Sequence, residues 1–304
     1  GLNYNLKIGT TPGGSELLSP MARPGGYRKV VSFGNVFSDT SWTITDLIPG
    51  GEYYVSLQVL DNCFAGSEFS EPRKIQTASY FFRRWATDIP GVQAGSVKWG
   101  DYDNDGDLDL VVSGNHDPGT YFTRIYRNDD SVFVDINANL PGVYLSALAW
   151  GDYDNDGDLD LVLTGEIPGT GYGKIYRNDN GTFTDIQAAI APSYGGSVAW
   201  GDYDNDGDLD LLQTGWGWFY GNPMTRLYRN DGGNFYNVPT DLPNVWSSTA
   251  IWGDYDRDGD LDILISGWGL PEYITKVFRN DNGSFTEDTD INLPQVRNSS
   301  AAWG

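Results

Sequence analysis

The stretch that decides the fold is Trp99-Gly100-Asp101-Tyr102-Asp103-Asn104-Asp105-Gly106-Asp107-Leu108-Asp109-Leu110. The same letters return at residues 150–161 and 200–211, and again at 252–263 with Arg257 in place of the asparagine and Ile263 in place of the last leucine. The copies are spaced by about 50 residues, a period typical of architectures in which each repeat is one supersecondary unit. The sequence therefore predicts four repeated structural units.

Each copy contains five aspartates within nine residues. Carboxylates so close together repel one another by about 1 kcal/mol per pair even in watery surroundings, so the cluster needs a cation. Ca²⁺ prefers hard oxygen ligands at alternate positions, with a glycine that allows a sharp turn. In the first copy we expect side-chain oxygens from Asp101, Asp103 and Asp105, the backbone carbonyl of Asp107, and a closing carboxylate from Asp109.

The same positions recur in loops 101–109, 152–160, 202–210 and 254–262, so the sequence predicts four Ca²⁺ sites. The predicted ligand residues are Asp101, Asp103, Asp105, Asp107, Asp109, Asp152, Asp154, Asp156, Asp158, Asp160, Asp202, Asp204, Asp206, Asp208, Asp210, Asp254, Asp256, Asp258, Asp260 and Asp262. Asn104, which lies between Asp103 and Asp105, is not a predicted metal ligand. Arg257 stands there in the fourth copy, so we expect a change at Asn104 to have little effect.

An EF-hand is excluded, because it needs a glutamate at the twelfth loop position and a helix after the loop. The residues at that position are Val112, Leu163, Gln213 and Ile265. A short apolar run ending in glycine follows each loop and predicts a buried strand, so the loop is expected to be the turn of a β-hairpin.

The four segments resemble FG-GAP/VCBS repeats, the blades of the integrin alpha-subunit propeller. All four loops match that family's pattern D-x-[DN]-x-[DN]-G-x-x-D, and the resemblance covers residues 80–304. It implies an all-β fold of four four-stranded, propeller-type blades with calcium-binding hairpin loops. Two arrangements remain open, a closed propeller and an open calcium-laddered array.

Four strands are expected in each repeat. In the first repeat they contain Trp99, residues 108–113, residues 124–128, and residues 133–136. The tryptophans of the five Trp-Gly pairs are expected to pack in the cores of the blades; they are Trp99, Trp150, Trp200, Trp252 and Trp303. The arginines of the third strands are expected to form inter-strand or inter-blade ion pairs; they are Arg127, Arg177, Arg229 and Arg279.

Residues 1–78 predict a different domain, followed by the repeats at 79–304. Alternating patterns predict strands at 2–8, 41–45, 52–59 and 73–77. The run Leu47-x-Pro49-Gly50-Gly51-Glu52-Tyr53 resembles the tyrosine corner of a fibronectin type III domain. Nothing in residues 1–78 corresponds to the first two strands of that fold, so a partial sandwich with an unpaired edge is expected.

The net charge and the residue composition exclude several classes of function. A net charge of −23 excludes nucleic acid as a partner, since binding it needs the opposite sign. Cys63 is the only cysteine, so no internal disulfide forms, and Ca²⁺ would stabilise the fold in an extracellular setting. The sequence contains no apolar run long enough to span a membrane. With one histidine and with the aspartates assigned to metal loops, no catalytic constellation emerges, and the chain is expected not to be an enzyme.

We therefore expect a non-enzymatic, calcium-binding structural or adhesion protein, extracellular or at the cell surface. Its expected partners are other proteins or copies of itself. The incomplete units at both ends of the sequence have two explanations, a larger parent chain with more blades or head-to-tail assembly of copies into a fibre. The alternative is a carbohydrate-binding module that uses aromatic loops around Trp216 and Trp268, since aromatic side chains on loops can stack on sugars.

Overall fold

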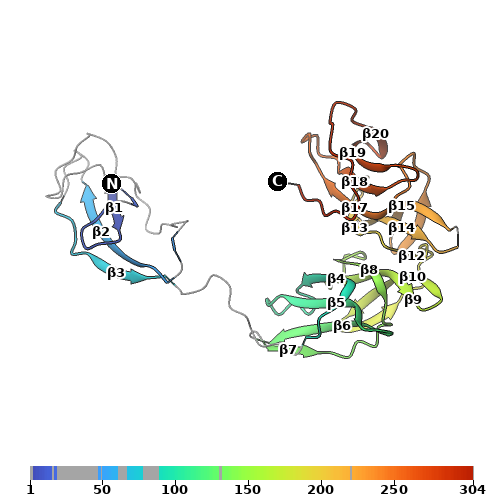
Figure 1. The fold of residues 1–304 in the computed structure, drawn as a ribbon, viewed down its shortest axis with the longest axis horizontal. Coiled ribbons are helices and arrows are strands. Elements are labelled where there is room, and N and C mark those ends of the chain that lie inside the picture. Colours follow the sequence, from blue (N-terminus) through green and yellow to red (C-terminus); the bar gives the residue numbers. More distant parts are fainter. Residues whose placement is uncertain are drawn as a thin grey trace. The chain divides into compact units, whose positions relative to one another are not determined.

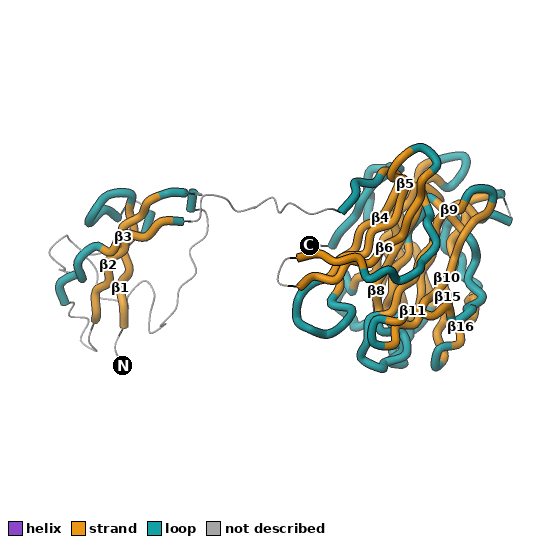
Figure 2. Tube along the Cα trace, turned by 90° about the horizontal axis from the view of Figure 1, so that it is seen from below, coloured by secondary structure: helices purple, strands orange, loops and turns teal. Residues whose placement is uncertain are grey.

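The structure is a computed structural model that describes residues 3–15, 17–18, 47–48, 50–60, 67–77, 89–129, 132–219 and 221–303. Two compact units divide the chain, Gly1–Ala86 and Thr87–Gly304. All regular structure in the described ranges is β-strand (Figures 1 and 2), which confirms the predicted all-β class. Those ranges contain no helix that could cross a membrane.

The first unit contains one antiparallel sheet with the strand order β1-β2-β3. Its strands are β1 (Asn3–Gly9), β2 (Glu52–Leu60) and β3 (Arg73–Gln76), close to three of the predicted strands. Tyr53 is buried, and its hydroxyl accepts a 2.7 Å hydrogen bond from the backbone N–H of Ile48, as in a tyrosine corner. The strand predicted at 41–45 lies outside the described residues. Assignment to the fibronectin type III family stays a prediction.

The second unit consists of four antiparallel sheets that follow one another in chain order (Figure 1), one for each repeat. The first is formed by β4 (Gln93–Gly100), β5 (Asp109–Asp117), β6 (Thr120–Asp129) and β7 (Val132–Asp135). The second is formed by β8 (Tyr144–Gly151), β9 (Asp160–Ile167), β10 (Thr170–Asp179) and β11 (Thr182–Asp185). The four strands predicted for these repeats are confirmed.

In the third repeat the first strand is split in two, and both parts pair with the second strand. This sheet contains β12 (Ser193–Tyr194), β13 (Val198–Gly201), β14 (Asp210–Gly217), β15 (Asn222–Asp231) and β16 (Asn234–Val238). The fourth sheet contains β17 (Trp246–Gly253), β18 (Asp262–Trp268), β19 (Tyr273–Asp281) and β20 (Ser284–Glu287).

Each aspartate loop joins the first and second strands of its sheet, as predicted. In the first repeat Gly100 pairs with Asp109 and Trp99 with Leu110, and the other repeats keep this register. The second strands are apolar on both faces because each face of the strand is covered; Val111 and Val112, which point to opposite faces, are both buried.

Neighbouring sheets are joined by a tryptophan that packs against a glycine. Trp150 of the second sheet lies over Gly100 of the first and stacks on Tyr102, with 6.3 Å between ring centroids. A Cβ atom at Gly100 would lie 2.6 Å from Trp150 Cδ1, so only glycine leaves room for the indole. The later pairs are Gly151 with Trp200, Gly201 with Trp252, and Gly253 with Trp303. The predicted core role is confirmed for Trp150, Trp200 and Trp252, which pack on the buried clusters, whereas Trp303 covers Gly253 from a segment outside the described sheets.

Trp99 departs from this pattern. No described repeat precedes the first one, and the Trp99 side chain is 57% exposed, with Phe133 of its own sheet 5.9 Å away. The prediction that Trp99 lies in a blade core is wrong, because the core position exists only where a preceding repeat supplies the glycine and tyrosine. Among the described residues the four sheets form no closed barrel or propeller.

The arginines of the third strands pair within their own strand. Arg177 lies 2.7 Å from Asp179, and Arg279 lies 3.0 Å from Asp281. The equivalent pairs in the first and third repeats are Arg127–Asp129 and Arg229–Asp231. The predicted inter-strand or inter-blade pairing is wrong, because residues two apart on a strand share a face and bring arginine and aspartate together first.

We expect Gly151→Ala to lower the free energy of unfolding by about 1–3 kcal/mol through overpacking. The added Cβ would meet Trp200 Cδ1 at 2.5 Å, and the indole is held by a hydrogen bond from its Nε1 to the Ala149 carbonyl. Gly91→Ala is the matched control, because its added Cβ meets nothing within 4 Å. Urea denaturation measures both variants, and equal stability of the two would contradict the packing argument.

Candidate metal sites

Each aspartate loop is bent by two residues with left-handed backbone. In the first loop these are Asn104 (φ 59°) and Gly106 (φ 95°), residue types that adopt this conformation with little strain. The carboxylate of Asp101 accepts hydrogen bonds from the backbone N–H groups of Asp105 and Gly106, both at 3.1 Å. The loop therefore folds around the carboxylate of its first aspartate.

The last aspartate of each loop is fully buried at the start of the second strand. Asp109 accepts hydrogen bonds from the backbone N–H groups of Tyr102 (3.0 Å) and Asn128 (2.8 Å), which attach the loop to the third strand. Asp160, Asp210 and Asp262 accept the equivalent bonds. Burial raises the pKa of Asp109 to about 6 and the pKa values of Asp160 and Asp210 to about 7.

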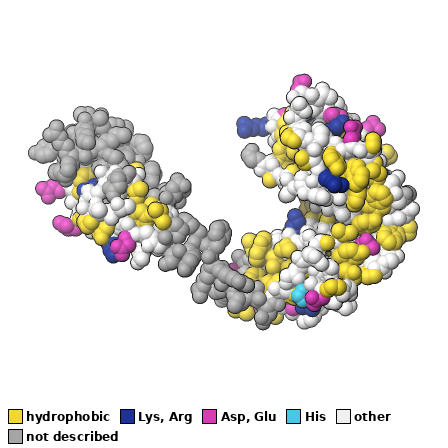
Figure 3. All heavy atoms as spheres, in the orientation of Figure 1, with side chains coloured by type: hydrophobic (Ala, Val, Ile, Leu, Met, Phe, Trp, Pro, Cys, Tyr) yellow, Lys and Arg dark blue, Asp and Glu magenta, His cyan; other side chains and the backbone are white. Residues whose placement is uncertain are grey.

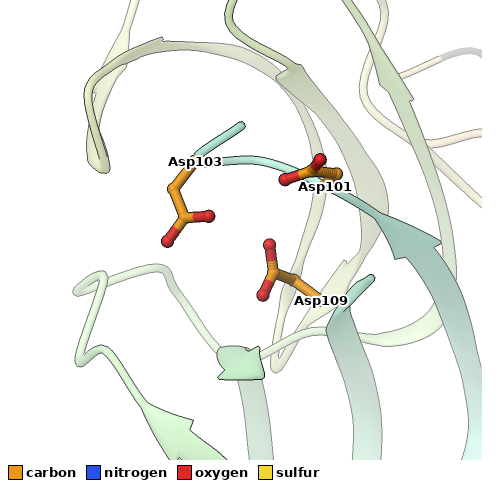
Figure 4. Close-up of side chains that lie close together, drawn as sticks. All are labelled: Asp101, Asp103 and Asp109. Atoms are coloured by element: carbon orange, nitrogen blue, oxygen red, sulfur yellow. The ribbon is translucent and has the colours of Figure 1, made fainter. Parts of the chain in front are cut away.

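Carboxylate oxygens gather at one point in each loop, within 4.8 Å of one another. Figure 4 shows three carboxylates of the first loop directed toward a common space. The four groups are Asp101, Asp103 and Asp109; Asp152, Asp154 and Asp160; Asp202, Asp204 and Asp206; and Asp254, Asp256 and Asp262. Each of these groups could hold a metal ion.

In three of the loops one oxygen of the second aspartate is buried and makes no hydrogen bond. It is Oδ1 of Asp103, Asp154 and Asp204. Burial, and next the negative charge of the following loop aspartate, raises the pKa of each of these carboxyls. A buried carboxylate oxygen without a partner is costly, and a cation would satisfy it. The residues present therefore fit a hard, oxygen-preferring cation.

Some predicted ligands lie outside these groups. The carboxylates of Asp105, Asp156, Asp210 and Asp258 are not among the clustered groups, and neither are those of the residues predicted to bind through a carbonyl (Asp107, Asp158, Asp208 and Asp260). The Oδ1 atom of Asp105 accepts a 2.9 Å bond from the backbone N–H of Asp107, so it shapes the loop. Their role as ligands stays a prediction.

Successive loops touch through the asparagine that the sequence analysis left without a role. Asn155 Nδ2 donates to the Gly207 carbonyl (3.2 Å) and to Asp208 Oδ1 (3.1 Å) of the next loop. Asn104 makes the same two bonds to the second loop, and Asn205 donates to Asp260. The expectation of little effect at this position does not fit these bonds. The missed signal is that asparagine occurs in all three copies for which the structure describes the next loop.

Trp216 and Trp268 were predicted on loops, and this placement is wrong, since they lie on strands β14 and β18. Trp246 lies between them, 5.2 Å from Trp216 and 5.4 Å from Trp268 by ring centroids. The guanidinium of Arg297 lies over the Trp268 ring at 5.4 Å. These rings join the third and fourth sheets by aromatic packing.

Comparison with known proteins identifies the repeats. A model of the FG-GAP-like repeat family matches residues 101–163 and 152–212. Residues 101–212 carry FG-GAP-like repeats. A crystal structure of the V. cholerae biofilm matrix protein Bap1 also matches, at 15% identity and a TM-score of 0.35, over 93% of this chain and 38% of Bap1. The chain thus spans well under half of that protein, and no curated protein matches it.

We expect Asn155→Ala to lower the free energy of unfolding by about 1–2 kcal/mol, because it removes the bonds to the next FG-GAP loop and places alanine in left-handed backbone. Arg257→Ala is the matched control. Its φ of 64° is similar, and Arg257 is exposed in the last described loop. Denaturation of dilute protein measures both, and an unchanged Asn155→Ala variant would show that contact between loops adds no stability.

The buried aspartates also predict a pH dependence. Their pKa values are raised on folding, so between about pH 4 and 7 the metal-free folded chain binds more protons than the unfolded chain. In EDTA the melting temperature should therefore fall as the pH rises from 5 to 7.5. Since Ca²⁺ needs ionised carboxylates, its stabilising effect should be larger at pH 7.5 than at pH 5. A Ca²⁺ effect that is equal at both pH values would contradict this assignment.

Proposed function

We propose that this chain is a non-enzymatic, calcium-binding, extracellular structural or adhesion protein whose repeats are stabilised by Ca²⁺. One observation carries the proposal: successive loops gather carboxylates within 4.8 Å and leave a buried, unpartnered oxygen at Asp103, Asp154 and Asp204. A cation that binds there removes the repulsion and satisfies that oxygen at the same time.

Ca²⁺ fits the loops better than Mg²⁺. Ca²⁺ accepts six to eight oxygen ligands in flexible geometry, whereas Mg²⁺ requires a near-ideal octahedron and keeps several of its waters. Each loop offers up to five aspartates and its own carbonyls, a set with many oxygens. All the aspartates from Asp101 to Asp109, and their counterparts in the other loops, are proposed as ligand residues.

An extracellular location and a structural role follow from this choice of ion. Ca²⁺ sites that form part of a fold suit surroundings rich in calcium, and the chain with its single Cys63 has no internal disulfide to serve instead. The matched FG-GAP-like repeats support this reading. Other proteins or further copies of this chain are the proposed partners, and a head-to-tail fibre is the proposed assembly.

Carbohydrate binding is the second candidate. Phe219 is 76% exposed and Tyr273 is 42% exposed, near the strands that contain Trp216 and Trp268, and Figure 3 shows hydrophobic side chains at the surface of the repeat unit. Exposed aromatic rings can stack on sugars. Trp246 is enclosed between Trp216 and Trp268, which favours a packing role for these three rings over sugar binding. A glycan array in saturating Ca²⁺ distinguishes the two candidates.

We expect EDTA to lower the melting temperature by tens of degrees. Binding to the folded state alone contributes roughly 1–3 kcal/mol per site at about 10 to 100 times Kd, and four such terms rival the stability of an ordinary domain. Asp154→Asn should reduce the effect of Ca²⁺, whereas Asp241→Asn, exposed and outside the loops, should not. Differential scanning calorimetry measures this, and identical curves in Ca²⁺ and EDTA would refute the proposal.

A further inference from the structure

The third strand of each repeat is longer than the fourth strand that pairs with it, so part of its edge faces no strand. In the first repeat β6 pairs with β7 only from Tyr126 to Asp129, and Thr123 lies on the remaining part. Thr225 and Thr275 hold the same position in the third and fourth repeats, and each of the three threonines pairs with a serine or threonine of the second strand. The three positions can therefore be compared directly.

The third and fourth repeats cap this edge with a side-chain amide. The N–H of Thr225 donates to Asn244 Oδ1 (2.9 Å), and the N–H of Thr275 donates to Gln295 Oε1 (2.7 Å). Gln295 Nε2 also donates to the Thr275 carbonyl (3.4 Å). The Thr225 hydroxyl donates to the Pro243 carbonyl (2.7 Å). One carboxamide group thus satisfies the polar backbone groups of the edge in each of these repeats.

The first repeat has no such cap. Gly142 stands where Asn244 and Gln295 stand, at the same distance before the Trp-Gly pair. A Cβ atom at Gly142 would overlap the carbonyl oxygen of Tyr121, so no side chain fits at this position. Within the described part of the chain the Thr123 hydroxyl has no hydrogen-bond partner, although Thr123 is only 5% exposed. A buried hydroxyl without a partner is costly, so the first repeat is incomplete at this point.

A cavity of about 270 Å³ lies at this edge of the first repeat. Its lining includes Thr123, Tyr121, Asp135 and Asn137. The N–H of Thr123 points away from β5, because the N–H of Thr225 does so in the same register. The cavity therefore presents the hydroxyl and the N–H of one residue together. Its volume is below the roughly 300–1,000 Å³ of small-molecule sites, so it suits one side chain.

The charge of the cavity lining is balanced. Arg124 and Asp135 are the charged residues among those that line it, and Arg124 Nε lies 3.4 Å from Asp135 Oδ2. A carboxylate that entered would meet Asp135 and would find the guanidinium already paired. The net charge of −23 on the chain also disfavours an acidic ligand. The lining therefore favours a neutral polar group.

We propose that this cavity binds the side-chain carboxamide of an asparagine or glutamine from a partner protein. The amide oxygen accepts hydrogen bonds from the N–H and the hydroxyl of Thr123, in the way that Gln295 and Asn244 accept from their own strands. This inference rests on the proposed adhesive function and deepens it by naming the chemical group that is recognised on the partner.

A primary amide is specified because Gln295 uses both its oxygen and its nitrogen on one strand residue. A secondary amide holds its N–H trans to its oxygen, so it cannot form both bonds to the same residue. The peptide backbone and N-acetylated sugars contain secondary amides. The side chains of asparagine and glutamine are thus the protein groups that match the cap.

Titration of the isotopically labelled full chain in millimolar Ca²⁺, followed by NMR, tests the proposal. The probes are Gly-Gln-Gly, Gly-Glu-Gly and Gly-Met-Gly peptides with acetyl and N-methylamide caps, and N-acetylglucosamine. We expect the glutamine peptide to shift the amide resonance of Thr123 and to bind at least fivefold tighter than the other probes. No shift, equal binding of the glutamine and methionine peptides, or tighter binding of N-acetylglucosamine would each overturn the proposal.

Thr123→Val separates recognition from folding. It removes a hydroxyl that has no partner, so the melting temperature should not fall, whereas affinity for the glutamine peptide should fall at least threefold. Thr225→Val should melt at a lower temperature, because it loses the bond to Pro243. Thr184→Val is the matched control for binding, since Thr184 is exposed on β11. A Thr123→Val variant that melts lower and binds the peptide unchanged would contradict the assignment.

Asp135→Asn tests the charge argument. It leaves Arg124 without its carboxylate, so the preference should change from the glutamine peptide to the glutamate peptide. A retained preference for glutamine would show that charge balance does not select the ligand and would overturn the assignment of a neutral group. The melting shift caused by Ca²⁺ is measured on the same samples. Loss of that shift would refute the calcium-binding function and leave the peptide result standing.

Discussion

Repulsion among five carboxylates in each nine-residue loop is the constraint on which the rest of the structure depends. The loop bearing Asp101 and Asp103 also contains Tyr102, on which the next sheet stacks through Trp150. The residues that would hold an ion are thus interleaved with those that join the sheets. Any force that spreads the carboxylates also moves the tyrosine and weakens the packing between repeats. An ion bound by these carboxylates would therefore also stabilise the packing between the sheets.

Most of the repeat unit could be predicted from the sequence, because a strict period fixes loops, strands and register at once. The N-terminal strands near Tyr53 were also predictable from alternation and from the tyrosine corner. The ion-pair partner of Arg177 could not be predicted, because a sequence pattern does not tell which of several nearby aspartates lies closest in space. The role of Asn155 was not predicted for a related reason. Arg257 at the equivalent position of the fourth copy suggested that this position tolerates any residue, whereas the Asn155 side chain bonds to Asp208 in the following repeat.

The contacts of a residue depend on which repeat contains it, even where the motif position is the same. Trp99 and Trp150 occupy the same place in the same motif, yet the first is largely exposed and the second packs on Gly100. No analysis of one repeat alone could separate them, because the difference lies in the neighbour. The same holds for Arg257, whose loop has no described successor.

The second and third repeats each offer a tryptophan to the repeat before and an asparagine to the repeat after, as Trp200 and Asn205 do for the third. Both contacts join the same two motif positions in neighbouring repeats, at a nearly constant separation in the sequence. Duplication or loss of one internal repeat in the gene would therefore leave the surfaces between the remaining repeats matched, whereas a change of half a repeat would not. Recombination can thus change the number of internal repeats one whole repeat at a time.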